Sequence, residues 1–219
     1  MDFAHYFPIW DKLTADQQNR IASVSEFQKI KSGTILHDGS PECMGMLLVK
    51  NGQLRAYILS EEGREVTICR FFEMDICLFS ASCVMPNMHF DIFIEAEKDT
   101  ELWVIPACLY QNLMDESLAI SNYSHDLITS HFSDVMWLME QIMWRSFDKR
   151  LALFLVEESR LEETRVLKLT HERIANHMGT AREVVTRMLR YFQGEGMVKL
   201  TRGAVELTDL KALRQLAGE

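Results

Sequence analysis

The segment LTHERIANHMGTAREVVTRMLRYFQGEGMV, residues 169–198, contains two short helical patterns separated by a single glycine. Thr170 stands where a hydroxyl can cap the first helix, and Gly179 stands where a left-handed residue can end it. Thr180, with Glu183 three positions later, forms a capping-box pattern for the second helix. The segment therefore predicts a helix-turn-helix, a motif that lays its second helix in the major groove of DNA.

The expected second helix has an apolar inner face and a polar outer face near its N-terminus. An arginine fork matches O6 and N7 of guanine, and a carboxylate accepts from the cytosine amino group. Apolar runs on both sides of Thr201-Arg202-Gly203 also predict a β-hairpin, or wing, that contacts phosphates. The expected DNA-binding residues are Thr180, Arg182, Glu183, Thr186, Arg187 and Arg202.

Charge is distributed unevenly along the chain. Residues 168–202 hold seven Lys or Arg against three Asp or Glu, a net charge of +4, whereas the whole chain carries −9, which leaves −13 for the remainder. A basic patch on an acidic protein focuses DNA contact on one surface. This favours DNA binding over an ordinary amphipathic helix with solvated charges.

The 219 residues are enough for one large or two modest domains. Hydrophobic residues make up 47% of the chain, but no apolar run approaches the roughly 20 residues that cross a bilayer. The N-terminal MDFAHYFPIWDKL has no signal-peptide pattern. Five cysteines without regular spacing argue against a disulfide framework, so we expect a cytoplasmic protein with no membrane partner.

The first part of the chain, to about residue 114, is expected to begin with a short helix near Thr14–Ala22. Short strands are expected to make up most of the rest of this part. Turn signals at Asp38-Gly39, Asn51-Gly52 and Glu62-Gly63 separate them. This pattern predicts an antiparallel barrel or jelly roll. The expected strands are Gly33–Leu36, Met46–Val49, Leu54–Leu59, Val66–Phe71, Phe90–Ala96 and Leu102–Ile105.

A long helix is predicted from roughly Glu116 to Arg145, and it carries two apolar stripes. One is a coiled-coil seam, Ile128, His131, Val135, Leu138 and Ile142, and the other is Phe132, Met136, Met139 and Met143. One stripe can pack on the strand domain and the other on the same helix of a second copy. This favours a homodimer over a helix that is buried on two sides within a single chain. We expect His131 to be a packed histidine.

The expected architecture is α+β, with an N-terminal antiparallel β-roll, a long dimerisation helix and a C-terminal winged helix-turn-helix. The expected lead-in helix of the last part is Phe147–Leu161, and its closing helix is Leu210–Leu216. The corresponding domains are residues 1–115 for sensing, 116–146 for dimerisation and 147–219 for DNA binding.

This order of parts resembles the CRP/FNR family of bacterial transcription factors, named after the cyclic-AMP receptor protein and the fumarate-nitrate regulator. The resemblance covers nearly the whole chain. KSGTILHDGSPECMGMLLVKNGQLRAYILSEEGREVTICRFFEMDIC, residues 31–77, is similar to the family's β-roll, and GTAREVVTR, residues 179–187, is similar to its recognition helix. The resemblance implies a cyclic-nucleotide-binding-like fold and base contacts from Arg182, Glu183 and Arg187 at a GTGA-type half-site.

The sensing half departs from the members that bind cyclic AMP. Those members carry a Gly-Glu pair and an Arg-Ser pair that hold the ribose and the cyclic phosphate. The Gly-Glu pair is missing from the matching residues 75–83 of this chain, and His89-Phe90 stands at the position of the Arg-Ser pair. Asp75 and Asp91 would repel a phosphate, and no arginine lies between residues 70 and 145. We therefore expect no cyclic-AMP binding.

The sequence leaves several other signals open for the sensing domain. An iron–sulfur cluster is not expected, because the first cysteine is Cys43 and no C-x-x-C pair occurs. Cys77 and Cys83 could form a thiol redox switch or, with His89, a haem or metal site, although buried structural cysteines are commoner. The leading hypothesis is a small, weakly charged effector. The candidate pocket residues are Phe72, Asp75, Cys77, Phe79, Ser80, Ser82, Cys83, His89 and Phe132.

The resulting functional hypothesis is a homodimeric, effector-responsive transcription factor, not an enzyme. Its expected partners are near-palindromic double-stranded DNA, RNA polymerase and an unidentified effector. One alternative is a cupin-like metal-dependent enzyme domain with a helical interaction module, but His37 and His89 stand alone without an H-x-H pattern. Another is a constitutive DNA binder whose sensor pocket has closed.

Overall fold

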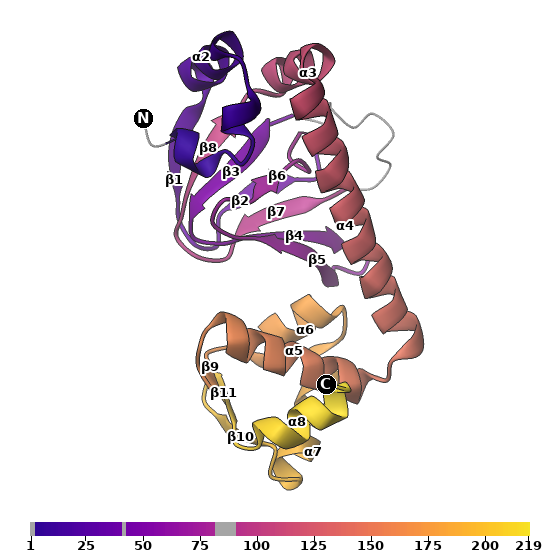
Figure 1. Ribbon diagram of the computed structural model, residues 1–219. Helices are drawn as coiled ribbons and strands as arrows, with labels where there is room; N and C mark the ends of the chain where they lie inside the picture. Colours follow the sequence, from indigo (N-terminus) through magenta and orange to yellow (C-terminus); the bar gives the residue numbers. More distant parts are fainter. Residues whose placement is uncertain (1–2, 41–42, 82–90) are drawn as a thin grey trace. The chain divides into compact units, whose positions relative to one another are not determined.

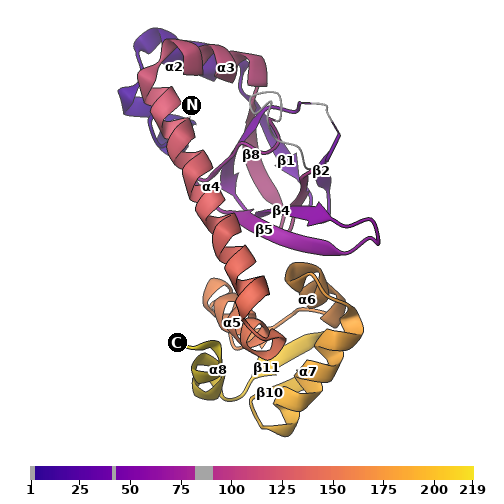
Figure 2. The same ribbon diagram turned by 90° about the vertical axis from the view of Figure 1, so that its right-hand side faces the viewer.

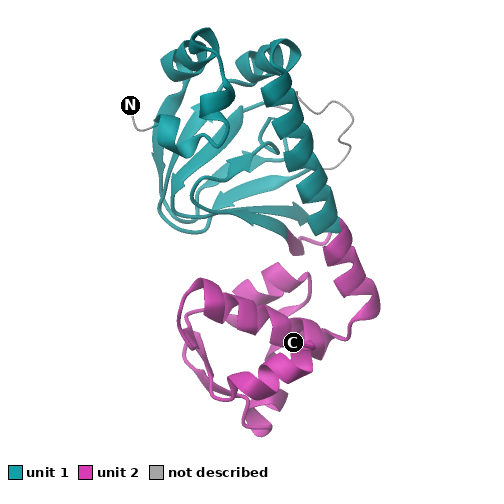
Figure 3. Ribbon diagram, in the orientation of Figure 1, with its two compact units in different colours: residues 1–59, 68–135 teal, residues 60–67, 136–219 magenta. Residues whose placement is uncertain are grey.

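The computed structural model describes residues 3–40, 43–81 and 91–219, and the chain divides into two compact units (Figures 1 and 3). Unit 1 comprises residues 1–59 and 68–135. Unit 2 comprises residues 60–67 and 136–219. No helix among the described residues is long and apolar enough to cross a membrane.

Unit 1 contains the antiparallel β-roll that the sequence predicts. Its strands form two four-stranded sheets. Within each sheet, every strand pair whose register the structure defines is antiparallel. One sheet has the order β1 (Glu26–Ile30), β8 (Thr100–Ile105), β3 (Met46–Asn51) and β6 (Ile76–Cys77). The other has the order β2 (Ile35–Asp38), β7 (Phe93–Ala96), β4 (Leu54–Leu59) and β5 (Glu65–Phe71).

The interior of the roll follows from strand alternation, because successive side chains point to opposite faces of a sheet. Leu54 and Ala56 on β4 pair in register with Ala96 and Ile94 on β7, and all four are fully buried. The turn between β3 and β4 needs Gly52, which has φ +100° and would place a Cβ 2.5 Å from a backbone oxygen of Asp99.

Short helices cover the roll at one end. They are α1 (Phe3–Tyr6), the 3₁₀ turn η1 (Trp10–Lys12), α2 (Ala15–Val24) and α3 (Ala107–Glu116), with α2 and α3 at the same end in both views (Figures 1 and 2). Phe3 and Trp103 pack edge to face with ring centroids 5.3 Å apart. Thr14 caps α2 through a reciprocal capping box with Gln17.

The long helix that the sequence predicts is present, and a shorter helix precedes it. The helical run starts already at Ala107, but Ser117 is extended at φ −122° and separates α3 from α4 (Leu118–Trp144). The ends of α4 lie within two residues of the predicted ones. On α4, His131 packs against Phe71 and Phe79, with ring centroids 5.5 and 5.0 Å apart.

Unit 2 contains the winged helix-turn-helix around its own core. The fully buried residues of this core include Leu151, Leu155, Val185, Leu189, Phe192 and Leu213. The elements are α5 (Phe147–Leu161), β9 (Val166–Leu167), α6 (His171–Met178), α7 (Arg182–Gly194), β10 (Val198–Thr201), β11 (Ala204–Leu207) and α8 (Leu210–Ala217). The three strands form one antiparallel sheet in the order β10-β11-β9.

Candidate nucleic-acid interface

Helix α6 begins and ends at the residues that the sequence predicts. The Thr170 hydroxyl accepts from the backbone N–H of Arg173 at 3.1 Å and so caps α6. Gly179 ends the helix in the left-handed region at φ +65°. These two residues fix where α6 begins and ends.

The start of α7 differs from the prediction. Ala181, not Thr180, is the N-cap residue, and no side chain caps the helix. The reason is that the backbone N–H of Thr180 donates to the Ala175 carbonyl at 3.1 Å, which makes Thr180 part of the turn that closes α6. The predicted capping box between Thr180 and Glu183 is therefore wrong.

The outer face of α7 near its N-terminus is polar and accessible. Arg182, Glu183 and Arg187 are exposed, and none of them has an ion pair within the described part of the chain. The inner face buries Val185 and Leu189 completely. The fold thus holds two guanidinium groups and one carboxylate on one rigid helical surface, ready to meet hydrogen-bonding groups outside the protein.

Thr186 is placed differently from these three residues. It is half-buried, and its hydroxyl donates to the Arg182 carbonyl at 2.9 Å. The same oxygen lies 2.9 Å from Nδ1 of His171, at the start of α6. His171 is a member of this surface that the sequence does not predict, because nothing in helical spacing brings residues 171 and 186 together.

A groove of about 430 Å³ opens beside this contact. It is bounded by the N-terminal ends of α6 and α7 and by the β10–β11 hairpin. Burial, followed by the nearby charges of Arg182 and Arg190, lowers the pKa of His171 below its ordinary value. The lining residues are Leu169, Thr170, His171, Glu172, Arg182, Thr201, Gly203 and Ala204.

The wing is a tight two-residue hairpin. Thr201 pairs with Ala204, which leaves Arg202 and Gly203 as the turn, and Gly203 has the positive φ of +75° that such a turn favours. Arg202 is exposed at the tip. A cation at this place is suited to a phosphate contact.

Comparisons with known proteins agree with this arrangement. A family model described as the Crp-like helix-turn-helix domain matches residues 149–216. A crystal structure from Eubacterium rectale, of a transcriptional regulator of the CRP/FNR family, is 55% identical, covers 98% of this chain and 100% of that one, and has a TM-score of 0.96. The chain belongs to the CRP/FNR family of transcriptional regulators. Its function is therefore that of a DNA-binding transcription regulator.

More distant relatives support the same fold over most of the chain. The fumarate and nitrate reduction regulatory protein of Escherichia coli is 23% identical over 217 residues, which span 94% of this chain and 84% of that protein. A CRP/FNR-family regulator from Thermus thermophilus has a TM-score of 0.72 at 23% identity, covering 89% of this chain and 99% of that one.

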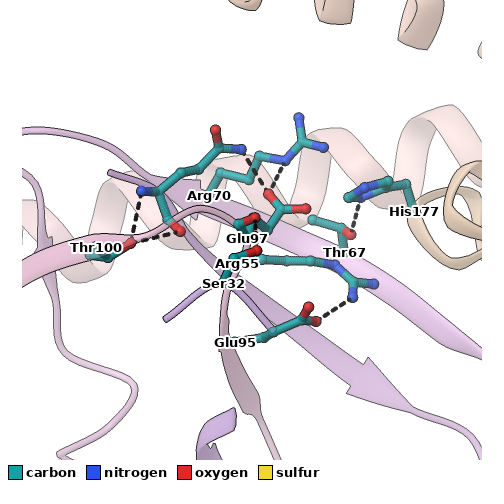
Figure 4. Close-up of polar contacts among 9 residues, drawn as sticks. Ser32, Arg55, Thr67, Arg70, Glu95, Glu97, Thr100 and His177 are labelled. Atoms are coloured by element: carbon teal, nitrogen blue, oxygen red, sulfur yellow. Dashed lines mark hydrogen bonds and ion pairs between the residues drawn. The ribbon is translucent and has the colours of Figure 1, made fainter. Parts of the chain in front are cut away.

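Within this CRP/FNR-family chain, the arginines of unit 1 are already engaged by carboxylates. Arg55 lies 3.4 Å from Glu95, its register partner on β7 (Figure 4). Arg70 lies 2.9 Å from Glu97, whose carboxylate also accepts from the Gln53 side chain at 2.7 Å. The third arginine, Arg20, pairs with Glu116. These carboxylates offset the positive charge that a cyclic phosphate would need.

The predicted effector-pocket residues fall into three groups. Cys77, Phe79 and Ser80 are buried, and the Ser80 hydroxyl donates to the Gly45 carbonyl at 2.6 Å, so this group contributes to the core. Phe72 is half-buried, and Asp75 and Phe132 are exposed. Ser82, Cys83 and His89 lie outside the described residues.

The described cysteines have different surroundings. Burial raises the pKa of the Cys77 thiol to about 12 and shifts that of Cys69 in the same direction, so both are neutral thiols at physiological pH. A neutral thiol is a poor nucleophile and metal ligand. Cys43 is disulfide-bonded, contrary to the expectation from the sequence. Within the described residues, no three His, Cys, Asp or Glu side chains gather in a way that could hold a metal.

Proposed function

We propose that the protein is a homodimeric transcription factor that binds near-palindromic double-stranded DNA in the cytoplasm and acts on RNA polymerase. The observation that carries this proposal is the exposed set Arg182, Glu183 and Arg187 at the N-terminal end of α7. In a helix-turn-helix this end meets base edges, and Arg202 on the wing would contact the backbone. The domains of the proposal are residues 1–115, 116–146 and 147–219.

The assignment separates base readout from phosphate contact. Arg182→Ala should relax base preference at one position of the half-site, because a bidentate arginine–guanine pair contributes about 1–3 kcal/mol of discrimination. Arg202→Ala should weaken binding about equally for all sequences. Fluorescence anisotropy on a duplex with two inverted GTGA half-sites and on a scrambled duplex measures both. Equal losses on both duplexes for both variants would refute the assignment.

We further propose that a signal received by the β-roll, other than cyclic AMP, shifts the population of DNA-binding states. A ligand can move such an equilibrium only by its differential affinity for the two states. Mass spectrometry and an absorption spectrum of natively purified protein would identify a bound small molecule or haem. If neither metabolites nor oxidants change DNA affinity, the protein is a constitutive binder.

A further inference from the structure

The groove between α6, α7 and the wing has a charge balance that depends on one residue. Its charged lining groups at neutral pH are the guanidinium of Arg182 and the carboxylate of Glu172, which cancel. The third titratable group of the lining is the imidazole of His171. Protonation of this ring changes the sum for the lining from zero to +1.

The hydrogen bonds of Thr186 determine which nitrogen of His171 can take the proton. A threonine hydroxyl has one proton, and Thr186 donates it to the Arg182 carbonyl at 2.9 Å. The Thr186 oxygen must then accept at its 2.9 Å contact with His171, so Nδ1 carries a hydrogen. Nε2 is left as the basic nitrogen of the neutral ring.

We infer that His171 takes up a proton at Nε2 when a DNA backbone phosphate enters this groove, so that DNA affinity rises as pH falls while base preference stays unchanged. The inference rests on the proposed DNA-binding function and adds a proton-linked phosphate contact to it. The proton comes from solvent and forms a charge-assisted N–H···O hydrogen bond to a phosphate oxygen. A neutral Nε2 would instead present its lone pair to that oxygen.

Burial and the charges around His171 together set the direction of this linkage. On α7, Arg182 and Arg190 disfavour a further positive charge, and on α6 Glu172 is the charged neighbour within the groove. The wing contributes Thr201 and Gly203, which do not titrate. In the free protein burial, followed by the charges of these two arginines, lowers the pKa of His171, and a phosphate anion would raise it by offsetting the arginines. At pH values between the pKa of His171 in the free protein and its pKa in the DNA complex, binding is therefore accompanied by proton uptake.

Anisotropy titrations of the full chain at about pH 6 and about pH 8 test the inference, since this range spans histidine titration. The probe is the duplex with two inverted GTGA half-sites. One linked proton changes Kd by at most about tenfold per pH unit. Wild type should bind more tightly at the lower pH, and its salt slope should be steeper there by about 0.9, the value for one phosphate contact.

Two substitutions at the same position give opposite expectations. His171→Gln keeps a donor for Thr186 but cannot become charged, so it should lose the additional affinity and salt slope at the lower pH and match wild type at the higher pH. His171→Lys should bind tightly at both. His5→Gln, at an exposed position of α1, is the matched control and should keep the wild-type pH dependence.

The outcomes separate this inference from the proposed function. Wild type that does not distinguish the half-site duplex from scrambled DNA would overturn the proposed function. Specific binding with the same pH dependence in wild type and His171→Gln would overturn only the inference. NMR titration of the His171 ring in wild type, free and DNA-bound, does not depend on any variant folding, and an unchanged pKa would also overturn the inference.

Discussion

The surroundings of His131 disfavour the protonated form of its ring. Its ring packs against Phe71 and Phe79, and neither nitrogen has a hydrogen-bond partner among the described residues. The nearest carboxylate, that of Asp134, is 3.8 Å from Nδ1. Burial lowers the pKa of His131, and Asp134 and Asp75 compensate for this only in part.

The stability of the protein should therefore fall as the solution becomes acidic. The unfolded chain binds a proton at His131 near the ordinary histidine pKa of about 6.5, whereas the folded chain resists it, so the free energy of unfolding decreases below about pH 6.5. His131→Phe should reduce this decrease in urea unfolding at about pH 5.5 and 7.5. His125→Gln, an exposed change on the same helix, should leave it intact. Equal pH dependence in all three proteins would contradict this prediction.

At the scale of elements, α6 and α7 differ in how they begin. Thr170 caps α6 with its side chain, whereas α7 starts at Ala181 without a side-chain cap. Thr170→Ala should lower the free energy of unfolding by about 1 kcal/mol. Thr180→Ala should cost much less, because the Thr180 backbone, not its hydroxyl, closes the turn. Urea unfolding of both variants measures the difference, and a larger loss for Thr180→Ala would restore the capping box that the sequence predicts.

Two glycines of the same unit should respond oppositely to alanine. Gly179 has φ +65°, so a Cβ is strained there, and Gly179→Ala should destabilise the protein by about 1 kcal/mol or more. Gly194 ends α7 with ordinary helical geometry and open space around its Cα, so Gly194→Ala should stabilise by about 0.5–1 kcal/mol. Melting curves of the two variants give the comparison. A shift of the same sign in both would contradict it.

Elements with strong local patterns were predictable from the sequence. The helix that the sequence predicts at Phe147–Leu161 is α5, and the flanking apolar runs correctly predict the β10–β11 hairpin. Strand β1 was missed because it lies at a sheet edge, mostly exposed, and has no apolar alternation. The exposed face of α7 was visible in helical spacing, but the contact between His171 and Thr186 depends on tertiary packing, which spacing does not encode.

At the scale of the whole molecule, the exposed apolar stripe of α4 is the feature that a second copy would cover. Phe132 is 64% exposed and Met143 is 63% exposed. Ile128, which the sequence analysis placed in the seam, also belongs to this outer stripe. The outer stripe consists of Ile128, Phe132, Met136, Met139 and Met143, spaced by four, four, three and four residues. This spacing matches the face that one helix presents to another in a two-helix seam.

The proposed dimer predicts that Phe132→Glu combined with Met143→Glu gives a monomer, because four carboxylates would meet across the paired helices in an apolar seam. Light scattering should report the mass of one chain for this variant and of two chains for wild type. Val24→Glu, at an exposed apolar position of α2, is the control and should stay dimeric. The double variant should also lose affinity for a two-half-site duplex far more than for a single half-site, since only the dimer engages both sites at once. Wild-type protein that remains a single chain with and without this duplex would exclude the dimer.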